Sequence, residues 1–105
     1  MDKFVLYIKR KGETQLQEYF IKQTNGELHI SRWGPVEEDR PFDMDSIDFS
    51  SDFGRVILPD GKTLSGLVNG DLIEVEEEGQ EPYYAVYQGQ FRYSETQQSL
   101  NSSGH

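Results

Sequence analysis

The sequence predicts a mostly β domain, either a small antiparallel barrel or a sandwich of about seven short strands. Short apolar runs recur at close spacing, and turns that contain glycine separate them. The stretch 64–93 shows this best, because an apolar run, a Gly/Pro turn and an aromatic run follow one another as in a β-meander. The chain has 105 residues and no cysteine, so one domain must bury its core without disulfides.

The segment 3–9 is the first predicted strand, because its apolar residues alternate between two faces. One face carries Phe4, Leu6 and Ile8, and the other carries Val5 and Tyr7. A strand that is apolar on both faces belongs in the middle of a sheet. Gly12 follows a basic turn that ends it.

The segment 15–23 has two interpretations. Leu16, Tyr19 and Phe20 are spaced as on a helix, so one helix near residues 14–24 would make an α+β fold. The dipeptide Asn25-Gly26 instead indicates a two-residue hairpin turn. Such a turn pairs Ile21 with Ile30 and Tyr19 with Arg32. We favour this hairpin, with 27–33 as its second strand.

The later elements follow from turn residues. An irregular acidic loop is expected over 37–52, with one helical turn after Asp45 or Ser46 and apolar residues that hold it on the barrel. Further strands are expected at 54–58, 63–64, 71–76, 83–88 and 91–93. The run 70–75 resembles the strand opening of SH3-like and OB-like small barrels, a resemblance too general to identify a family. Residues 1–93 form the predicted domain, and 94–105 form a polar tail expected to be disordered.

Charge is distributed unevenly along the chain. Nineteen acidic and ten basic residues give a net charge of −9. Residues 1–22 carry five basic and three acidic groups, and the rest carry five basic and sixteen acidic groups. Such a surface repels nucleic acid and anionic membranes and attracts basic proteins. Acidity that serves solubility alone is an equal alternative. The opening residues lack a secretory pattern, so a cytoplasmic location is expected.

Catalytic and metal-binding patterns are weak, and we expect neither an enzyme nor a cofactor. A nucleophilic triad would need His29, because the other histidine, His105, ends the polar tail, and His29 is expected to be a surface residue on a strand opposite Lys22. The acidic loop contains a carboxylate cluster, but it lacks the glycine and the closing glutamate of an EF-hand. The cluster consists of Asp43, Asp45, Asp48 and Asp52.

Two acidic segments that mix carboxylates with apolar residues remain as the predicted contact surface for a basic protein: the loop 37–52, and the strand and turn 74–81. Phe42 and Phe49 are the expected apolar anchors, with Phe53 and Trp33 as further candidates. The predicted contact residues are Glu37, Glu38, Asp39, Phe42, Asp43, Asp45, Asp48, Phe49, Asp52, Glu74, Glu76, Glu77, Glu78 and Glu81.

Carboxylates spaced on an apolar scaffold can imitate the phosphates of nucleic acid. The hypothesis is therefore a small inhibitor, of an immunity type or a phage anti-defence type, that occludes a basic nucleic-acid-handling partner. The alternative is a small-barrel accessory or adaptor domain in a larger assembly, a homodimer included. The sequence leaves the oligomeric state open.

Overall fold

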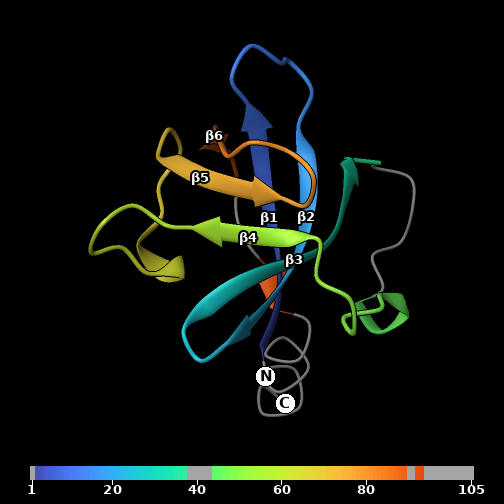
Figure 1. The fold of residues 1–105 in the computed structure, drawn as a ribbon. Coiled ribbons are helices and arrows are strands. Elements are labelled where there is room, and N and C mark those ends of the chain that lie inside the picture. Colours follow the sequence, from blue (N-terminus) through green and yellow to red (C-terminus); the bar gives the residue numbers. More distant parts are fainter. Residues whose placement is uncertain (1, 38–43, 90–91, 94–105) are drawn as a thin grey trace, which may run out of the picture.

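The computed structural model describes residues 2–37, 44–89 and 92–93, and it shows a mostly β fold with a closed antiparallel barrel of six strands (Figure 1). The predicted fold class is confirmed. The strands are β1 (Asp2–Arg10), β2 (Gln17–Thr24), β3 (Glu27–Pro35), β4 (Gly54–Ile57), β5 (Leu72–Glu77), β6 (Tyr83–Tyr87) and β7 (Arg92–Tyr93). Two short 3₁₀ turns, η1 (Met44–Ser46) and η2 (Leu64–Gly66), lie between strands.

Strand β1 closes the barrel. Each strand from β1 to β6 pairs with the next, and β6 returns to pair with the last residues of β1. The first residues of β1 pair with β7 instead, so β6 and β7 share one edge of β1 while β2 takes the other. Figure 1 shows β4 and β5 crossing β1 and β2 at a steep angle, as the strand tilt of a small closed barrel requires. The prediction that β1 is a central strand is confirmed.

The hairpin of β2 and β3 replaces the alternative helix near residues 14–24, which is wrong. Asn25 and Gly26 have φ angles of 54° and 82°. Both angles are positive, as a two-residue turn of this twist requires. Ile21 lies opposite Ile30, as predicted.

A β-bulge shifts the rest of this hairpin by one residue. Phe20 lies opposite Arg32 and the next β2 residue lies opposite Ile30, so Ser31 is the extra residue. Tyr19 is consequently paired with Trp33 and not with Arg32, which corrects the predicted register. The shift stacks the two rings with centroids 6.0 Å apart.

Two apolar clusters hold the fold together. The larger fills the barrel and includes one face of β1, while the smaller lies outside the barrel on the other face of β1. In the smaller cluster Met44, Ile47 and Phe49 pack against Val5 and Phe20. The prediction that apolar residues hold the acidic loop on the barrel is confirmed for this part of the loop.

Three expectations about the later elements need correction or stay open. The segment expected to restart a strand at 63–64 leads into η2, whose Leu64 is buried in the barrel. The helical turn of the acidic loop is Met44–Ser46, ahead of the position predicted after Asp45 or Ser46. The expected tail at 94–105, and the positions 38–43 and 90–91, lie outside the described residues.

Candidate protein-interaction site

The two acidic segments meet where the chain enters β4 and leaves β5. The backbone N–H of Glu78 donates to the carbonyl of Phe53 at 2.6 Å, which joins the end of the acidic loop to the end of β5. A shallow hollow of about 440 Å³ lies at this junction. We call it the Phe53 hollow, and its walls are His29, Asp52, Phe53, Gly54, Arg55, Glu76, Glu77 and Glu78.

Gly54 makes this junction possible, because two backbones approach one another closely here. Gly54 pairs with Glu77 at the start of β4. A Cβ atom at Gly54 would lie 1.7 Å from the carbonyl oxygen of Glu76 and 2.9 Å from the Cα of Glu77. Only glycine therefore allows β4 to lie against β5 at this point.

The hollow combines an exposed aromatic ring with carboxylates. Phe53 is 44% exposed and is one of six large apolar residues that are exposed in the described part of the chain. Asp52 and Glu78 are exposed beside it, and Glu76 is half-buried. Many protein interfaces combine an apolar anchor with a surrounding polar rim, and the hollow has both kinds of group.

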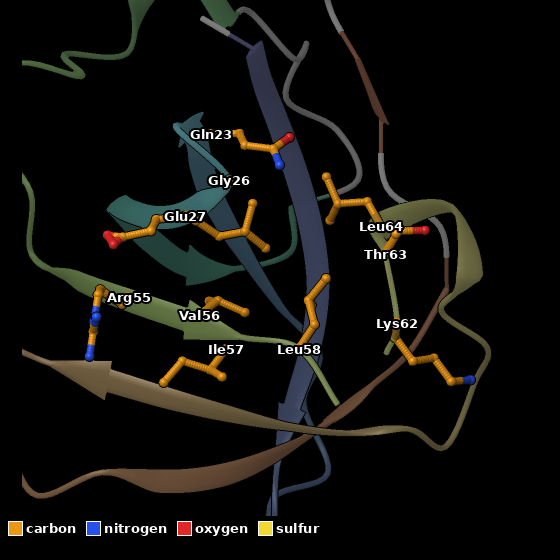
Figure 2. Close-up of a pocket in the computed structure, with 11 residues that line it drawn as sticks. Gln23, Gly26, Glu27, Arg55, Val56, Ile57, Leu58, Lys62, Thr63 and Leu64 are labelled. Carbon is orange, nitrogen blue, oxygen red and sulfur yellow. The ribbon is translucent and has the colours of Figure 1, made fainter. Parts of the chain in front are cut away.

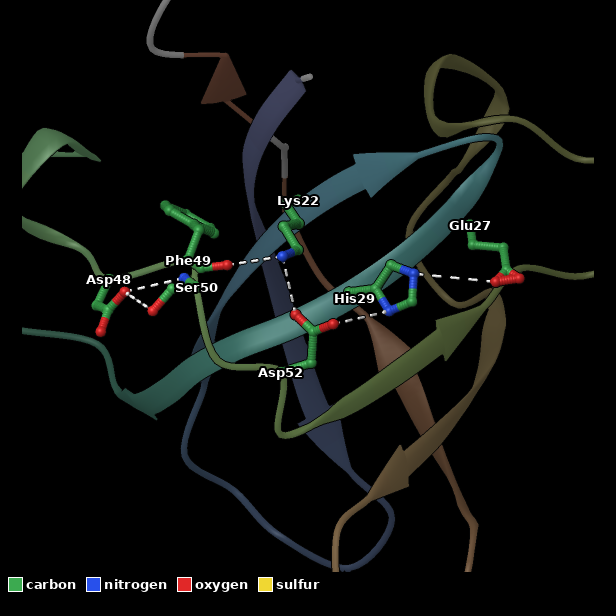
Figure 3. Close-up of polar contacts among 7 residues, drawn as sticks. All are labelled: Lys22, Glu27, His29, Asp48, Phe49, Ser50 and Asp52. Atoms are coloured by element: carbon green, nitrogen blue, oxygen red, sulfur yellow. Dashed lines mark hydrogen bonds and ion pairs between the residues drawn. The ribbon is translucent and has the colours of Figure 1, made fainter.

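An ion network crosses the outer surface of the barrel beside the hollow (Figure 3). The Nζ of Lys22 lies 3.1 Å from the carboxylate of Asp52 and donates to the carbonyl of Phe49 at 2.6 Å. His29 Nδ1 lies 3.6 Å from Asp52, and His29 Nε2 lies 3.9 Å from Glu27. His29 and Lys22 are opposite each other on β3 and β2, as predicted. The network positions Asp52 and offsets its charge.

A second ion pair, on β4 and β5, lies next to this network. Arg55 lies opposite His29 on one side and Glu76 on the other. Its Nη2 donates to the Glu76 carboxylate at 2.8 Å. Two of the three surface carboxylates at the hollow are thus already paired with cations, and Glu78 has no ion pair among the described residues.

Glu77 is wrongly predicted as a surface contact residue. It is 6% exposed, because alternate residues of β5 face the barrel interior and Glu77 follows Ile73 and Val75 on that face. Its two carboxylate oxygens accept hydrogen bonds from Nη2 of Arg10 at 3.1 and 3.3 Å. The carboxylate therefore stabilises the barrel and is not on the surface.

Phe49 is likewise not an exposed anchor. It is 9% exposed and packs in the outer cluster with Val5 and Phe20. The Nζ of Lys3 lies 5.3 Å from the centroid of its ring. Phe49 holds the acidic loop in place, and the exposed aromatic residue at the junction of the two segments is Phe53.

The other predicted contact residues are dispersed. Glu37 lines a separate hollow beside Trp33, and the exposed Asp45 and Asp48 belong to the η1 region. The hydroxyl and N–H of Ser50 donate to Asp48 and lower the pKa of its carboxyl group. Glu74 lies on the outer face of β5, and Glu81 lies in the turn after it. Glu38, Asp39, Phe42 and Asp43 lie outside the described residues.

A polar network at one end of the barrel was not expected from the sequence. Nε of Arg10 donates to the hydroxyl of Tyr83 at 3.0 Å, and the Tyr83 and Tyr19 hydroxyls lie 2.9 Å apart. The guanidinium carbon lies 4.8 Å from the centroid of the Trp33 ring and 4.9 Å from that of Tyr83. Burial raises the pKa of Tyr19 and of Tyr83 above the ordinary 10.0. Both phenols therefore stay protonated in the folded chain, and Trp33 helps to close this end.

A second pocket of about 440 Å³ lies between the β2–β3 turn and the segment before η2 (Figure 2). Leu28 and Leu64 supply apolar wall, and Gln23 supplies an amide. The Nζ of Lys62, also at this pocket, is 3.0 Å from Asp71. The pocket has no acidic cluster, and it belongs to neither predicted segment.

Within the described part of the chain, no group of three or more His, Cys, Asp or Glu residues is arranged to hold a metal ion. No helix in that part has the length and apolar character needed to cross a membrane. In comparisons with known proteins, no family model, no curated protein and no solved structure matches the chain. The function must therefore be argued from the geometry of the surface.

Proposed function

We propose that the chain is a non-enzymatic protein-binding domain that docks on a basic surface through the Phe53 hollow. Its effect would be to occlude a nucleic-acid-handling partner, as an inhibitor of an immunity type or a phage anti-defence type does. The observation that supports this proposal is the exposed ring of Phe53 at the place where both acidic segments meet. The ring supplies an apolar anchor, and the surrounding carboxylates favour cations on the partner.

The charge distribution supports the same proposal. Lys22, Arg55, Arg10 and Lys62 each offset one carboxylate through an ion pair, and they leave the other acidic groups unbalanced. The chain keeps a net charge of −9, which accelerates its encounter with a basic protein and repels nucleic acid. At the hollow itself Glu78 supplies the local attraction, because Asp52 and Glu76 are already paired.

The first experiment is a pull-down with the tagged chain from lysate of the source cells, at low and at moderate salt. We expect one basic nucleic-acid-handling protein, in an amount that falls as the salt concentration rises. The purified partner is then tested for loss of its activity when the chain is added. A partner that binds but keeps full activity would refute occlusion.

Surface variants then locate the contact. Phe53→Ala and Glu78→Lys should each weaken binding by at least about tenfold. Asp60→Lys is the matched control, because Asp60 is exposed in the turn beyond the far end of β4. Equal effects of Glu78→Lys and Asp60→Lys would show that only net charge matters and that the hollow is not the contact.

The accessory-domain alternative also has a supporting observation. Tyr84 on β6 and Leu72 on β5 are 60% and 58% exposed, although Tyr83 and Tyr87 on the same strand face the barrel. An apolar outer face of this kind is typical of a subunit that docks into an assembly. Recovery of a stable multi-subunit assembly, unchanged by salt, would favour this alternative over the inhibitor.

A further inference from the structure

The outer face of β6 and its neighbours carries a compact apolar patch away from the Phe53 hollow. Strand alternation directs the core residues Ile8, Ile73 and Ala85 inward and the residues between them outward. Two rows result, in register across the strands. We call this surface the β5–β6 face, and it consists of Lys9, Val86 and Leu72 in one row and Tyr84, Glu74 and Ile57 in the next.

Its exposure sets this patch apart from the rest of the barrel. Leu72 and Tyr84 are more than half exposed, and Ile57 is 38% exposed. Val86 lies between them and is half-buried. Contiguous apolar residues on a small soluble domain indicate an interaction surface.

The charges on this face are balanced, unlike those of the whole chain. Its only charged residues are Lys9, at the β1 end of the first row, and Glu74, in the second row between Tyr84 and Ile57. Two strands and two residues separate them, roughly 12 Å between their Cα atoms at ordinary sheet spacings. Within the described residues no ion pair joins them. The face therefore offers one positive and one negative group to whatever covers it.

We propose that the β5–β6 face binds the same face of a second copy of this chain, with twofold symmetry. A twofold axis lying in the plane of the interface, between Val86 and Tyr84, brings Lys9 of each copy against Glu74 of the other. The apolar residues between them are then covered by their own counterparts. A strongly basic partner would gain nothing from this electrically neutral face, whereas an identical face is complementary to it.

The small size of the β5–β6 face predicts that the dimer is weak. Six residues a side is below the usual interface of about 20–30 residues a side, so the dimer should be weak, with a dissociation constant on the order of micromolar or above. The Phe53 hollow lies outside the six residues of the face. Dimerisation would thus leave it open to the proposed partner.

Charge reversal tests the pairing directly. Sedimentation equilibrium over a range of concentrations gives the association constant of the wild-type chain and of Lys9→Glu, Glu74→Lys and the double variant. Each single reversal should weaken association at least about tenfold, and the double reversal should restore it because both pairs form again with opposite signs. Lys11→Glu makes the same charge change in the exposed turn after β1 and should have little effect.

A second measurement does not depend on the charged residues. The chain has no cysteine, so Tyr84→Cys introduces a single thiol close to the proposed axis. A short bismaleimide should link two copies of this variant and should not link Val68→Cys, which is exposed outside the face. A wild-type chain that stays monomeric at every concentration would overturn the proposal. Failure of the double reversal to restore association, or equal cross-linking of the two cysteine variants, would do the same.

Discussion

Replacing Gly54 by alanine tests the close backbone approach between β4 and β5. The added Cβ would lie 1.7 Å from the carbonyl oxygen of Glu76, and this distance must grow to at least about 3.0 Å. Both atoms belong to backbone that is fixed in the β4–β5 ladder, so no side-chain rotation can relieve the contact. The strands must separate where Gly54 meets Glu77.

The cost follows from what this separation breaks. At least two backbone hydrogen bonds at the start of β4 are lost or lengthened, at about 1 kcal/mol each, or more where a buried group is left unpaired. Backbone strain adds to this, so the free energy of unfolding should fall by about 3 kcal/mol or more. For a domain of this size that corresponds to a decrease in Tm of roughly 12–24 °C.

Urea unfolding followed by circular dichroism measures the change. Gly34→Ala is the control, because Gly34 is also a strand glycine and its added Cβ would meet nothing within 4 Å. We expect a change below about 1 kcal/mol for the control, whose φ is not positive. A Gly54→Ala variant as stable as wild type would show that β4 and β5 are not packed as described.

Three further predictions concern other parts of the fold. Glu77→Gln should lower the free energy of unfolding, measured by urea denaturation, by about 2–3 kcal/mol, because Arg10 loses its counter-charge. The effects of Glu77→Gln and Arg10→Met should not add in the double variant. Additive effects would contradict the ion pair. Phe49→Ala should cost about 3 kcal/mol and expose the 44–52 segment to proteases, so unchanged proteolysis would contradict its anchoring role. Burial raises the pKa of Tyr19 and Tyr83, so the stability they contribute is complete below the unfolded value of 10.0 and is lost as pH rises above it. Unfolding measured between about pH 9 and pH 11 should show this loss, and a Tyr83→Phe variant with the same pH slope would contradict it.

The fold was predictable wherever local pattern and turn chemistry agree. The apolar alternation in β1 predicts which of its residues share a face, and the two faces pack in the inner and outer clusters. Asn25-Gly26 identifies the hairpin, because the turn needs positive φ angles and these two residue types adopt them readily. The bulge at Ser31 escaped the prediction, which continued the alternation of Leu28 and Ile30 to Arg32 although the next apolar residue is Trp33. The sequence predicts Leu64 as a strand residue because one buried leucine fits a 3₁₀ turn and a strand equally well.

The site was less predictable, because its pairs join distant parts of the chain. Arg10 and Glu77 are 67 residues apart and meet only when β6 closes the barrel on β1. The signal available for Glu77 was its position, since it continues the inward alternation of Ile73 and Val75. The residue type alone predicts a surface position for Glu77, because glutamate is mostly exposed. Residue type does not reveal that Arg10 pairs with this carboxylate at one end of the barrel.

Strand β5 shows why one short segment can serve both the core and two surfaces. Its inward residues end in the buried carboxylate of Glu77, which fixes Arg10 and one end of the barrel. Its outward residues are Leu72 and Glu74, which belong to the β5–β6 face, and Glu76, which belongs to the wall of the Phe53 hollow. The Arg55–Glu76 ion pair is part of the wall of the hollow, and Glu74, two residues earlier, is part of the β5–β6 face. Reversing Glu74 should therefore affect self-association alone, and reversing Glu78 should affect partner binding alone. A single variant that abolished both would indicate one continuous interface across β5.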